Sequence, residues 1–216
     1  FKGQNICITG AGGSIGSQLS KEIHKLNPNK LILIDMSEIN LYEINKELHK
    51  KNKVEVISIL CNCNNYDLIK KILIENSVSV VFHAAAYKHV SLVERNPISG
   101  LLNNVLTTRI LCKTCLELNI DKFLFISTDK AVRPANVMGA SKRLAELIVQ
   151  DYARKVLDEN KRGKNNHTKF SIVRFGNVLG SSGSVIPLFK EQIKKGGPIT
   201  VTHPEVIRYF MTIKEA

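Results

Sequence analysis

Four side chains that could move protons occupy consecutive positions in the chain: Ser127, Thr128, Asp129 and Lys130. They follow Lys122 to Ile126, whose apolar and β-favouring residues predict a buried parallel strand. The carboxyl ends of such strands are where open α/β sheets hold their ligands. The four residues therefore suit acid and base chemistry in a site, although without the rest of the chain an ordinary charged surface loop fits them equally well.

A helix is predicted to complete this arrangement. Pro134 and Gly139 interrupt the chain, and Ala140 to Tyr152 is expected as a helix of good helix formers with its apolar side inward. Lys142 stands in the first turns of that helix and is expected to face back toward the same site. The pattern thus brings a helix lysine to a strand end that carries a carboxyl and an amine.

A glycine-rich turn comes directly after the first predicted strand, Asn5 to Thr9. The residues of the turn are Gly10, Ala11, Gly12, Gly13, Ser14, Ile15 and Gly16. Glycines between a strand and a helix let the backbone approach a pyrophosphate and aim helix N–H groups at it. The spacing G-x-x-G-x-x-G differs from the commoner G-x-G-x-x-G, so the turn alone is a weak signal.

An acid at the end of the second predicted strand strengthens that signal. Helix Ser17 to Leu26 leads to strand Lys30 to Ile34, which ends in Asp35. A carboxylate there is placed to bind the ribose hydroxyls of a dinucleotide and would repel a 2′-phosphate, so NAD is favoured over NADP. The alternative is that Asp35 caps the next helix, a role for which Ser37 competes.

Strands and helices continue to alternate along the chain. Helix Ile39 to Lys50 precedes strand Val54 to Leu60, and helix Tyr66 to Asn76 precedes strand Val78 to Phe82. Strands joined by helical crossovers predict an α/β fold: a Rossmann-like doubly wound parallel sheet with helices on both faces. Lys161 to Lys169 is predicted as an exposed polar connection.

Small and basic residues follow the fourth predicted strand: Ala84, Ala85, Ala86, Lys88 and His89. The alanines would let a cofactor lie close to the backbone. Lys88 and His89 would then point toward a substrate, although a solvated loop accounts for them nearly as well.

The composition limits the class of protein. The chain has 216 residues, of which 44% are hydrophobic and 23% charged, and this excludes a disordered or fibrous class. No apolar segment approaches the roughly 20 residues of a membrane span, so no span is expected in this chain. Five cysteines, an odd number, indicate reduced thiols in a cytoplasmic compartment. Cys112 and Cys115 lack the second ligand pair that zinc needs, so no metal site is expected.

The chain is basic, with 31 Lys and Arg against 19 Asp and Glu and a formal net charge of +12. The positive residues are spread without a basic helix-turn-helix, a zinc finger or an aromatic-studded basic strip, so we expect a solvated basic surface and no nucleic-acid partner. A positive field would still favour a polyanionic small substrate such as a nucleotide.

Five segments together carry a resemblance to a known family: TGAGGSIG at 9 to 16, HAAAYKHV at 83 to 90, NNVLTT with Asn104, STDKAVRPANVMGASK at 127 to 142, and RFGNVLGSSGSVIPLF at 174 to 189. The chain resembles the extended short-chain dehydrogenase/reductase superfamily. Within it, the chain resembles the CapD-like nucleotide-sugar 4,6-dehydratases that act on UDP-N-acetylglucosamine. The resemblance covers nearly the whole chain, and five segments in one order are far more specific than the glycine turn.

The resemblance implies a mechanism for the reactive residues. In such enzymes NAD takes a hydride from sugar C4, water is eliminated across C5 and C6, and the hydride returns to C6. Neutral Lys130 would remove the C5 proton, and protonated Asp129 would donate to the departing C6 hydroxyl. Thr128 would hydrogen-bond the sugar O4, and Lys142 would hold the nicotinamide ribose. A surface Asp–Lys pair is the simpler alternative.

One residue departs from the superfamily pattern. The tyrosine that precedes the helix lysine corresponds to Met138, and a thioether cannot accept a proton as a phenolate does. One branch of the 4,6-dehydratases, often fused to a membrane-spanning N-terminal region, resembles this chain in carrying methionine there, and we expect an active member of that branch. The alternative is a catalytically inactive cofactor-binding remnant.

The resemblance also implies roles for residues outside the reactive segment. Asn62 stands where family members often carry an acid for the adenine amino group, and it can still accept a hydrogen bond. Asn104 is expected at the cofactor, with Thr107 in place of a frequent glycine. Asn177 matches a residue near the sugar-nucleotide diphosphate, and Arg208 resembles a phosphate-binding arginine.

We expect two parts in the chain: an NAD-binding Rossmann-like domain at residues 1–176 and the incomplete start of a smaller substrate-binding region at 177–216. Val201 to Ala216 is predicted as the start of a helix that is cut off. We expect a homo-oligomer in the cytoplasm, or at the cytoplasmic face of the membrane if the native protein has an N-terminal membrane region. The alternatives to a dehydratase are a UDP-sugar 4-epimerase, which needs no base at C5, and a non-catalytic NAD-binding module.

Overall fold

The computed structural model describes residues 1–49, 54–181, 185–201, 203–205, 207 and 209–216. The chain divides into two compact units, Phe1–Arg174 and Phe175–Ala216. None of the helices in these described ranges has the length and apolar character that a membrane crossing requires.

The first unit is built on a six-stranded sheet. Its strands are β1 (Asn5–Thr9), β2 (Lys30–Asp35), β3 (Glu55–Leu60), β4 (Val80–His83), β5 (Lys122–Thr128) and β6 (Lys169–Phe175). They lie in the order β3-β2-β1-β4-β5-β6, and β1 pairs in parallel with both β2 and β4. The predicted doubly wound α/β fold is confirmed. The strand order reverses between β1 and β4, which is where folds of this kind form their ligand crevice.

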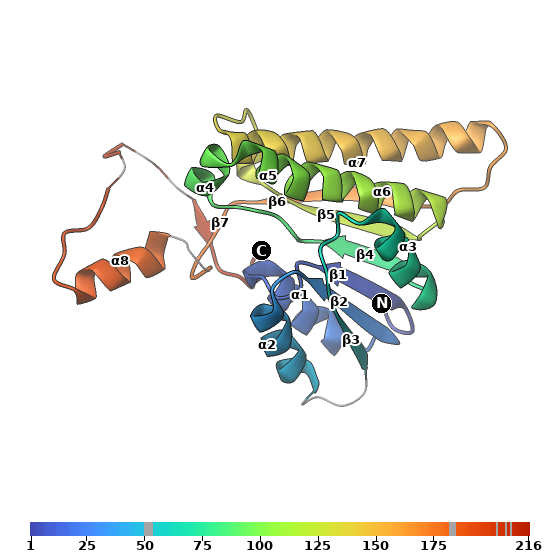
Figure 1. Cartoon of the computed structure of the whole chain (residues 1–216), viewed down its shortest axis with the longest axis horizontal. Helices are drawn as coiled ribbons and strands as arrows, with labels where there is room; N and C mark the ends of the chain where they lie inside the picture. The colour runs from blue at the N-terminus through green and yellow to red at the C-terminus, as the bar shows by residue number, and fades with distance from the viewer. Residues whose placement is uncertain (50–53, 182–184, 202, 206, 208) are drawn as a thin grey trace. The chain divides into compact units, whose positions relative to one another are not determined.

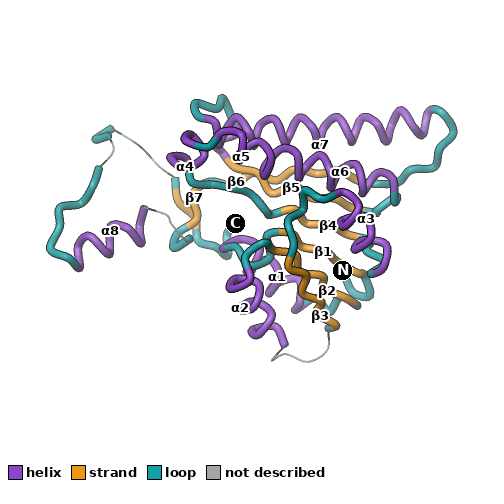
Figure 2. The backbone as a smooth tube through the Cα atoms, in the orientation of Figure 1, coloured by secondary structure: helices purple, strands orange, loops and turns teal. Residues whose placement is uncertain are grey.

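Helices cover both faces of this sheet (Figures 1 and 2). One face carries α1 (Ser14–Lys25) and α2 (Glu38–His49); the other carries α3 (Tyr66–Glu75), α6 (Thr107–Glu117) and α7 (Val137–Lys161). Alternate residues of β1 point to opposite faces of the sheet. Ile6 and Ile8 pack in the hydrophobic cluster with α1 and α2, while Cys7 packs in the cluster with α3, α6 and α7. Because both faces are covered, the central strands β1, β2 and β4 are buried along nearly their whole length.

Short helical segments connect β4 to α6 and β5 to α7. The first connection contains α4 (Val90–Arg95), α5 (Pro97–Leu101) and η1 (Leu102–Leu106), a π-helical turn that continues directly into α6. The second contains η2 (Asp129–Ala131), a single 3₁₀ turn. A π-helical turn inside a helix is uncommon and often occurs at functional sites.

The prediction that α7 begins at Ala140 and ends at Tyr152 is wrong at both ends, because the helix spans Val137–Lys161. Two acceptors bind its first backbone N–H groups: Asn136 Oδ1 accepts from Gly139 N at 2.8 Å, and Glu94 Oε2 accepts from Val137 N at 3.0 Å. These contacts satisfy donors that a helix start leaves unpaired. Gly139 lies inside the helix and is not a break; glycine is required there because a Cβ would lie 2.4 Å from the Lys130 carbonyl oxygen.

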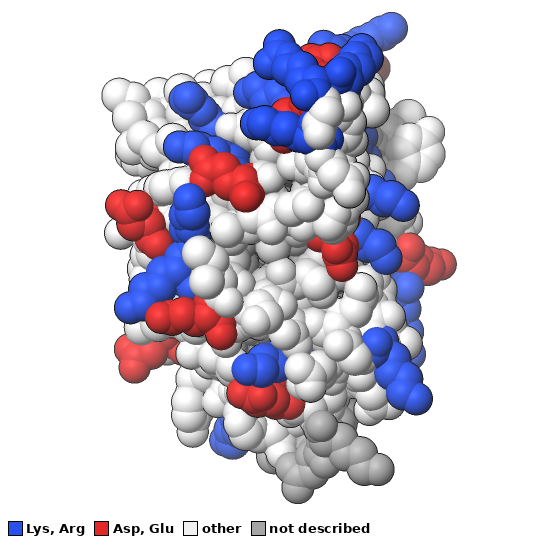
Figure 3. Space-filling view, turned by 90° about the vertical axis from the view of Figure 1, so that its right-hand side faces the viewer, with Lys and Arg blue, Asp and Glu red and all other residues white. Residues whose placement is uncertain are grey.

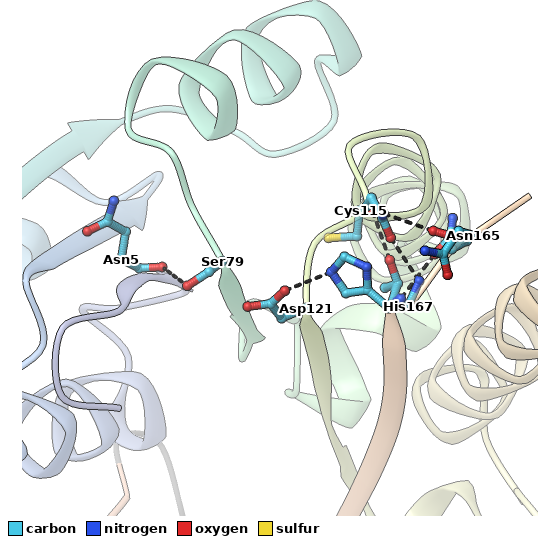
Figure 4. A network of polar contacts seen from close by, with 9 residues as sticks. Asn5, Ser79, Cys115, Asp121, Asn165 and His167 are labelled. Carbon is cyan, nitrogen blue, oxygen red and sulfur yellow. Dashed lines mark hydrogen bonds and ion pairs between the residues drawn. The ribbon is translucent and has the colours of Figure 1, made fainter.

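The opposite edge of the sheet, where the strands begin, is fixed by polar contacts between neighbouring strands. Figure 4 shows His167 directed at Asp121, with Nε2 to Oδ1 at 2.9 Å, and Ser79 Oγ donating to the Asn5 carbonyl oxygen at 3.3 Å. The connection before β6 was predicted to be exposed throughout, and this is wrong for Asn166 and Thr168, which are buried. They are buried because this loop folds back to hydrogen-bond neighbouring backbone groups.

The second unit contains β7 (Asn177–Val178), α8 (Val185–Lys194) and β8 (Phe210–Met211). The prediction of a helix over 201–216 is wrong for the described residues at its end. Phe210 and Met211 pair in parallel with Asn177 and Val178, and Leu179 N donates to the Met211 carbonyl oxygen at 2.9 Å. Aromatic and β-branched residues favour such an extended pairing.

Candidate functional site

The glycine turn after β1 lies directly against the alanine loop after β4. Gly10 has φ of +68°, and a Cβ at this position would lie 2.6 Å from the Ala85 Cα. A Cβ at Gly16 would lie 1.9 Å from the Gly10 carbonyl oxygen. The turn can therefore close against α1 and the alanine loop only with glycine at these two positions.

The first turn of α1 begins beside this turn. Gly13 is the N-cap residue and makes no side-chain cap hydrogen bond, and the first turn carries no acidic residue. Ser14 and Ile15 follow as the first residues of the helix. A helix start with this composition suits an anionic group such as a phosphate.

Asp35 connects the end of β2 to the glycine turn. Its buried carboxylate accepts from Gly12 N at 2.8 Å and from Ser37 N at 2.9 Å. Ser37, rather than Asp35, precedes α2 directly, and its Oγ accepts from Asn40 N at 3.4 Å. Each carboxylate oxygen has two lone pairs, so Asp35 retains acceptor capacity for a ribose hydroxyl.

The predicted reactive residues come together at the end of β5. Lys130 Nζ lies 3.1 Å from Asp129 Oδ1, and Thr128 Oγ1 donates to the same oxygen at 2.9 Å. Burial raises the pKa of Asp129, but the hydrogen bonds from Lys130 and Thr128 outweigh it and lower the pKa overall. In this arrangement Asp129 is a carboxylate and its partner is Lys130.

Lys142 is held beneath the end of β5. Its side chain is buried, its Nζ donates to the Ile126 carbonyl oxygen at 2.7 Å, and the same atom lies 4.0 Å from the centroid of the Phe125 ring. Burial lowers its pKa to about 7, partly opposed by the nearby charge of Glu146. Met138, one helical turn earlier, is also buried.

Glu146 is a buried acid that the sequence analysis did not identify. Its carboxylate accepts from Ser127 Oγ at 2.6 Å, from Arg174 Nε at 2.7 Å, and from one guanidinium nitrogen of Arg143 at 3.0 Å. Burial raises the pKa of Glu146, but these donors together lower it to about 2. The carboxylate fixes α7 to both β5 and β6. Its spacing from Lys142, one turn further along the inward side of the helix, was the signal available in the sequence.

Asn104 holds the loop that follows the alanines. Its Oδ1 accepts from Tyr87 N at 2.8 Å, and its Nδ2 donates to the Tyr87 carbonyl oxygen at 3.1 Å and to Ser141 Oγ at 2.9 Å. The amide therefore serves neighbouring protein groups, and its predicted contact with a cofactor stays a prediction. Lys88, the residue after Tyr87, is exposed overall, and partial burial of its amine lowers its pKa.

The remaining predicted site residues are Asn62, Asn177 and Arg208. Asn62 follows β3, and its Oδ1 accepts from Asn64 N at 3.0 Å, which leaves one lone pair for another donor. Asn177 belongs to the second unit, where its Nδ2 donates to the Tyr209 carbonyl oxygen at 3.1 Å. Arg208 lies outside the described residues.

The surface charges are mixed rather than segregated. On the face of the molecule drawn in Figure 3, basic side chains gather at the top, with acidic side chains among and below them. Several lysines are paired within α7, for example Lys155 Nζ with Asp151 at 2.7 Å and Lys161 Nζ with Asp158 at 3.7 Å. Among the described residues, no three His, Cys, Asp or Glu side chains gather as a metal-binding group.

Comparison with known proteins identifies the family. Residues 6–216 match the family model described as polysaccharide biosynthesis protein. The chain belongs to this family. A relative from Staphylococcus aureus, the capsular polysaccharide biosynthesis protein CapD, is 48% identical over 99% of this chain and 34% of its own length. A Campylobacter jejuni relative named UDP-N-acetylglucosamine 4,6-dehydratase (inverting) is 30% identical over all of this chain and 61% of its own length.

Another relative carries a different activity in its name. A Rickettsia rickettsii relative named UDP-glucose 4-epimerase is 31% identical over all of this chain and 61% of its own length. The solved structure of Pen from Bacillus thuringiensis superposes with a TM-score of 0.90 at 35% identity, covering all of this chain and 65% of the other. The chain thus spans about a third to three fifths of the length of these curated relatives.

Proposed function

We propose that this family member is the NAD-binding part of a nucleotide-sugar 4,6-dehydratase whose substrate is UDP-N-acetylglucosamine and whose product serves surface polysaccharide synthesis. The observation that carries the proposal is the Asp129–Lys130 pair, 3.1 Å apart beside Thr128 at the carboxyl end of β5. An elimination across two neighbouring carbons needs one group that takes a proton and one that gives a proton. The pair supplies both within one turn of chain.

The residues of the glycine turn fit an NAD molecule. Gly10 and Gly16 allow close backbone approach, the start of α1, whose first turn carries no acid, suits the pyrophosphate, and Asp35 suits unphosphorylated ribose hydroxyls. Lys142 is proposed to hold the nicotinamide ribose. When bound, NAD supplies the reversible hydride acceptor that makes a 4-keto sugar and so acidifies the proton at C5.

The proton balance of the elimination closes on the pair itself. Transfer of one proton from Lys130 to Asp129 converts the ion pair into a neutral amine and a neutral acid, and exclusion of water by a bound sugar favours this form. Lys130 then takes the C5 proton while Asp129 gives its proton to the departing C6 hydroxyl, which leaves as water. The original ion pair is restored with no proton gained or lost.

Met138 removes the phenolate that would take the proton from the sugar 4-hydroxyl. We propose that Thr128 binds O4 and that the neutral amine of Lys142, which is populated because burial lowers its pKa to about 7, accepts this proton. Lys88, Asn177 and Arg208 are proposed to contact the substrate.

The test is to incubate the full-length protein with UDP-N-acetylglucosamine in deuterated water and to examine the product by NMR. A 6-deoxy-4-keto sugar with deuterium at C5 is expected. Lys130→Met should lose at least about a hundredfold in kcat, the low end for loss of a general base. Lys71→Met, which removes a lysine that is 68% exposed, is the matched control and should retain full activity.

Two outcomes would replace the proposal. A UDP-sugar 4-epimerase, the activity named for the Rickettsia relative, would return a sugar that keeps its C6 hydroxyl and has no deuterium at C5. A non-catalytic module would bind NAD but give no product, and Lys130→Met would change nothing measurable.

A further inference from the structure

A buried histidine connects the glycine turn's strand to the π-helical turn. His83 is the last residue of β4 and is fully buried, and it pairs in register with Thr9 of β1. Its Nδ1 lies 2.7 Å from Thr9 Oγ1, and its Nε2 lies 3.1 Å from Thr108 Oγ1 on α6. Neither the proposed acid and base nor the proposed cofactor contacts include this imidazole.

The hydrogen-bond pattern fixes the tautomer of His83. Thr108 Oγ1 donates its single proton to the Asn104 carbonyl oxygen at 2.7 Å, so it can only accept from the imidazole. Nε2 of His83 must therefore carry the proton, and Nδ1 accepts the hydroxyl proton of Thr9. Burial, together with the nearby charge of Lys142, lowers the pKa of His83 to about 3, which agrees with a neutral ring.

The same network continues from the π-helical turn to the alanine loop. The backbone of Asn104 receives the bond from Thr108, while the side chain of Asn104 holds both backbone polar groups of Tyr87 and also Ser141 of α7. The segment Ala84–Ala86 lies between His83 and Tyr87, so it is anchored at both ends. This is also the segment against which Gly10 packs without room for a Cβ.

We propose that His83, as the neutral Nε2–H imidazole, is a positioning residue that holds the alanine loop against the glycine turn and so preorganises the dinucleotide site without touching the ligand. The imidazole is suited to this position because it is a donor on one side and an acceptor on the other. An apolar residue of equal volume leaves the buried hydroxyl of Thr9 without its acceptor, which costs more than the loss of packing. The inference rests on the proposed NAD site for its effect on binding, but not for its effect on the loop.

The first test needs no cofactor. Nitrogen NMR of the wild-type imidazole should show the neutral Nε2–H tautomer from about pH 5 to about pH 8, the range in which an ordinary histidine titrates. Amide hydrogen exchange at Ala85, Ala86 and Tyr87 should accelerate about tenfold in His83→Phe, the effect of losing one buried hydrogen bond. Observation of the Nδ1–H tautomer, or unchanged exchange in His83→Phe, would overturn the inference.

Matched variants separate this role from general damage to the fold. Thr108→Val removes the acceptor of His83, whereas Thr114→Val removes an equally buried hydroxyl on the same helix that donates to the Ile110 carbonyl oxygen within its own helix. We expect His83→Phe and Thr108→Val to weaken NAD binding about tenfold by calorimetry, and Thr114→Val to leave it unchanged. If Thr114→Val lowers the NAD affinity and the melting temperature as much as Thr108→Val does, His83 contributes only to packing of the core and the inference is wrong.

A conservative variant, His83→Gln, tests the same role, and it can be measured even if His83→Phe does not fold. His83→Gln retains a donor toward Thr108, so its loop exchange should lie between wild type and Thr108→Val. Exchange in His83→Gln as fast as in Thr108→Val would count against the inference. If the wild-type protein binds no NAD, the proposed function fails, while the NMR and exchange measurements still decide the role of His83.

Discussion

Replacing Glu146 with glutamine should remove a definite, pH-dependent share of the stability of the first unit. The carboxylate has no exposed side-chain surface, and its donors lower its pKa from 4.5 to about 2. At about 1.36 kcal/mol per pKa unit, this shift corresponds to about 3 kcal/mol of unfolding free energy at neutral pH. The side chains of Arg174 and Arg143 are 41% and 39% exposed, so water can solvate them after the substitution, and a loss of about 2–3 kcal/mol is expected.

The sign of the pH dependence follows from the direction of the shift. A carboxyl whose pKa is lowered in the folded state stabilises that state above the unfolded pKa of about 4.5 and loses the contribution as pH falls toward about 2. By pH 3, about 2 kcal/mol of the contribution is lost. Glu146→Gln lacks this component, so its unfolding free energy should converge with that of wild type as pH falls from 6 to about 3.

Urea unfolding followed by circular dichroism at a series of pH values measures this difference. Glu55→Gln is the matched control, because that carboxylate is 57% exposed and 3.7 Å from Lys30. We expect the control to stay within about 0.5 kcal/mol of wild type at every pH. A constant gap between Glu146→Gln and wild type from pH 6 to pH 3 would refute a stabilising role for the Glu146 charge.

Three further predictions concern the helices and the glycine turn. Burial lowers the pKa of Lys142 from 10.5 to about 7, so the buried charge destabilises the fold below pH 7, and this penalty disappears as pH rises toward 10.5. The unfolding free energy of Lys142→Met should therefore exceed that of wild type at pH 6 by up to about 5 kcal/mol. The difference should disappear by pH 10. Asn136→Ala should lower stability by about 1 kcal/mol in thermal unfolding, because it removes the cap bond to Gly139 N. Gly16→Ala should abolish a stable fold, since its Cβ would lie 1.9 Å from a carbonyl oxygen, whereas Gly13→Ala, at 3.3 Å, should melt within a few degrees of wild type.

The sequence was sufficient to predict the doubly wound architecture and five of its six strands, but not β6 or the contacts around the sheet. Alternating apolar strands and amphipathic helices determine a doubly wound architecture, because short crossovers leave few other ways to bury both faces. The start of α7 was missed although Asn136, its N-cap residue, was a local signal; only the second acceptor, Glu94, comes from a helix far back in the chain. The predicted helix at the end of the chain failed because β8 exists through its pairing with Asn177 and Val178, which a local pattern does not contain.

The candidate site shows the same division between local and non-local information. Asp129 and Lys130 are adjacent in the chain, so their pairing needed no long-range contact to be anticipated. The role of Asn104 depends on Tyr87 and Ser141, which approach it only in the folded chain. His83 belongs to the same class, since its two partners come from β1 and α6.

The end of β5 separates the structural and reactive tasks by strand alternation. Successive side chains of a strand point to opposite faces, so Ser127 is buried against Glu146 while Thr128, its neighbour, contacts Asp129. The buried acid fixes α7, and with it Lys142, relative to the strand. Asp129, the exposed acid, can then pair with Lys130 without also holding the helix in place. The Asp129–Lys130 pair can therefore be altered without removing the contacts by which Glu146 holds α7 against the strand.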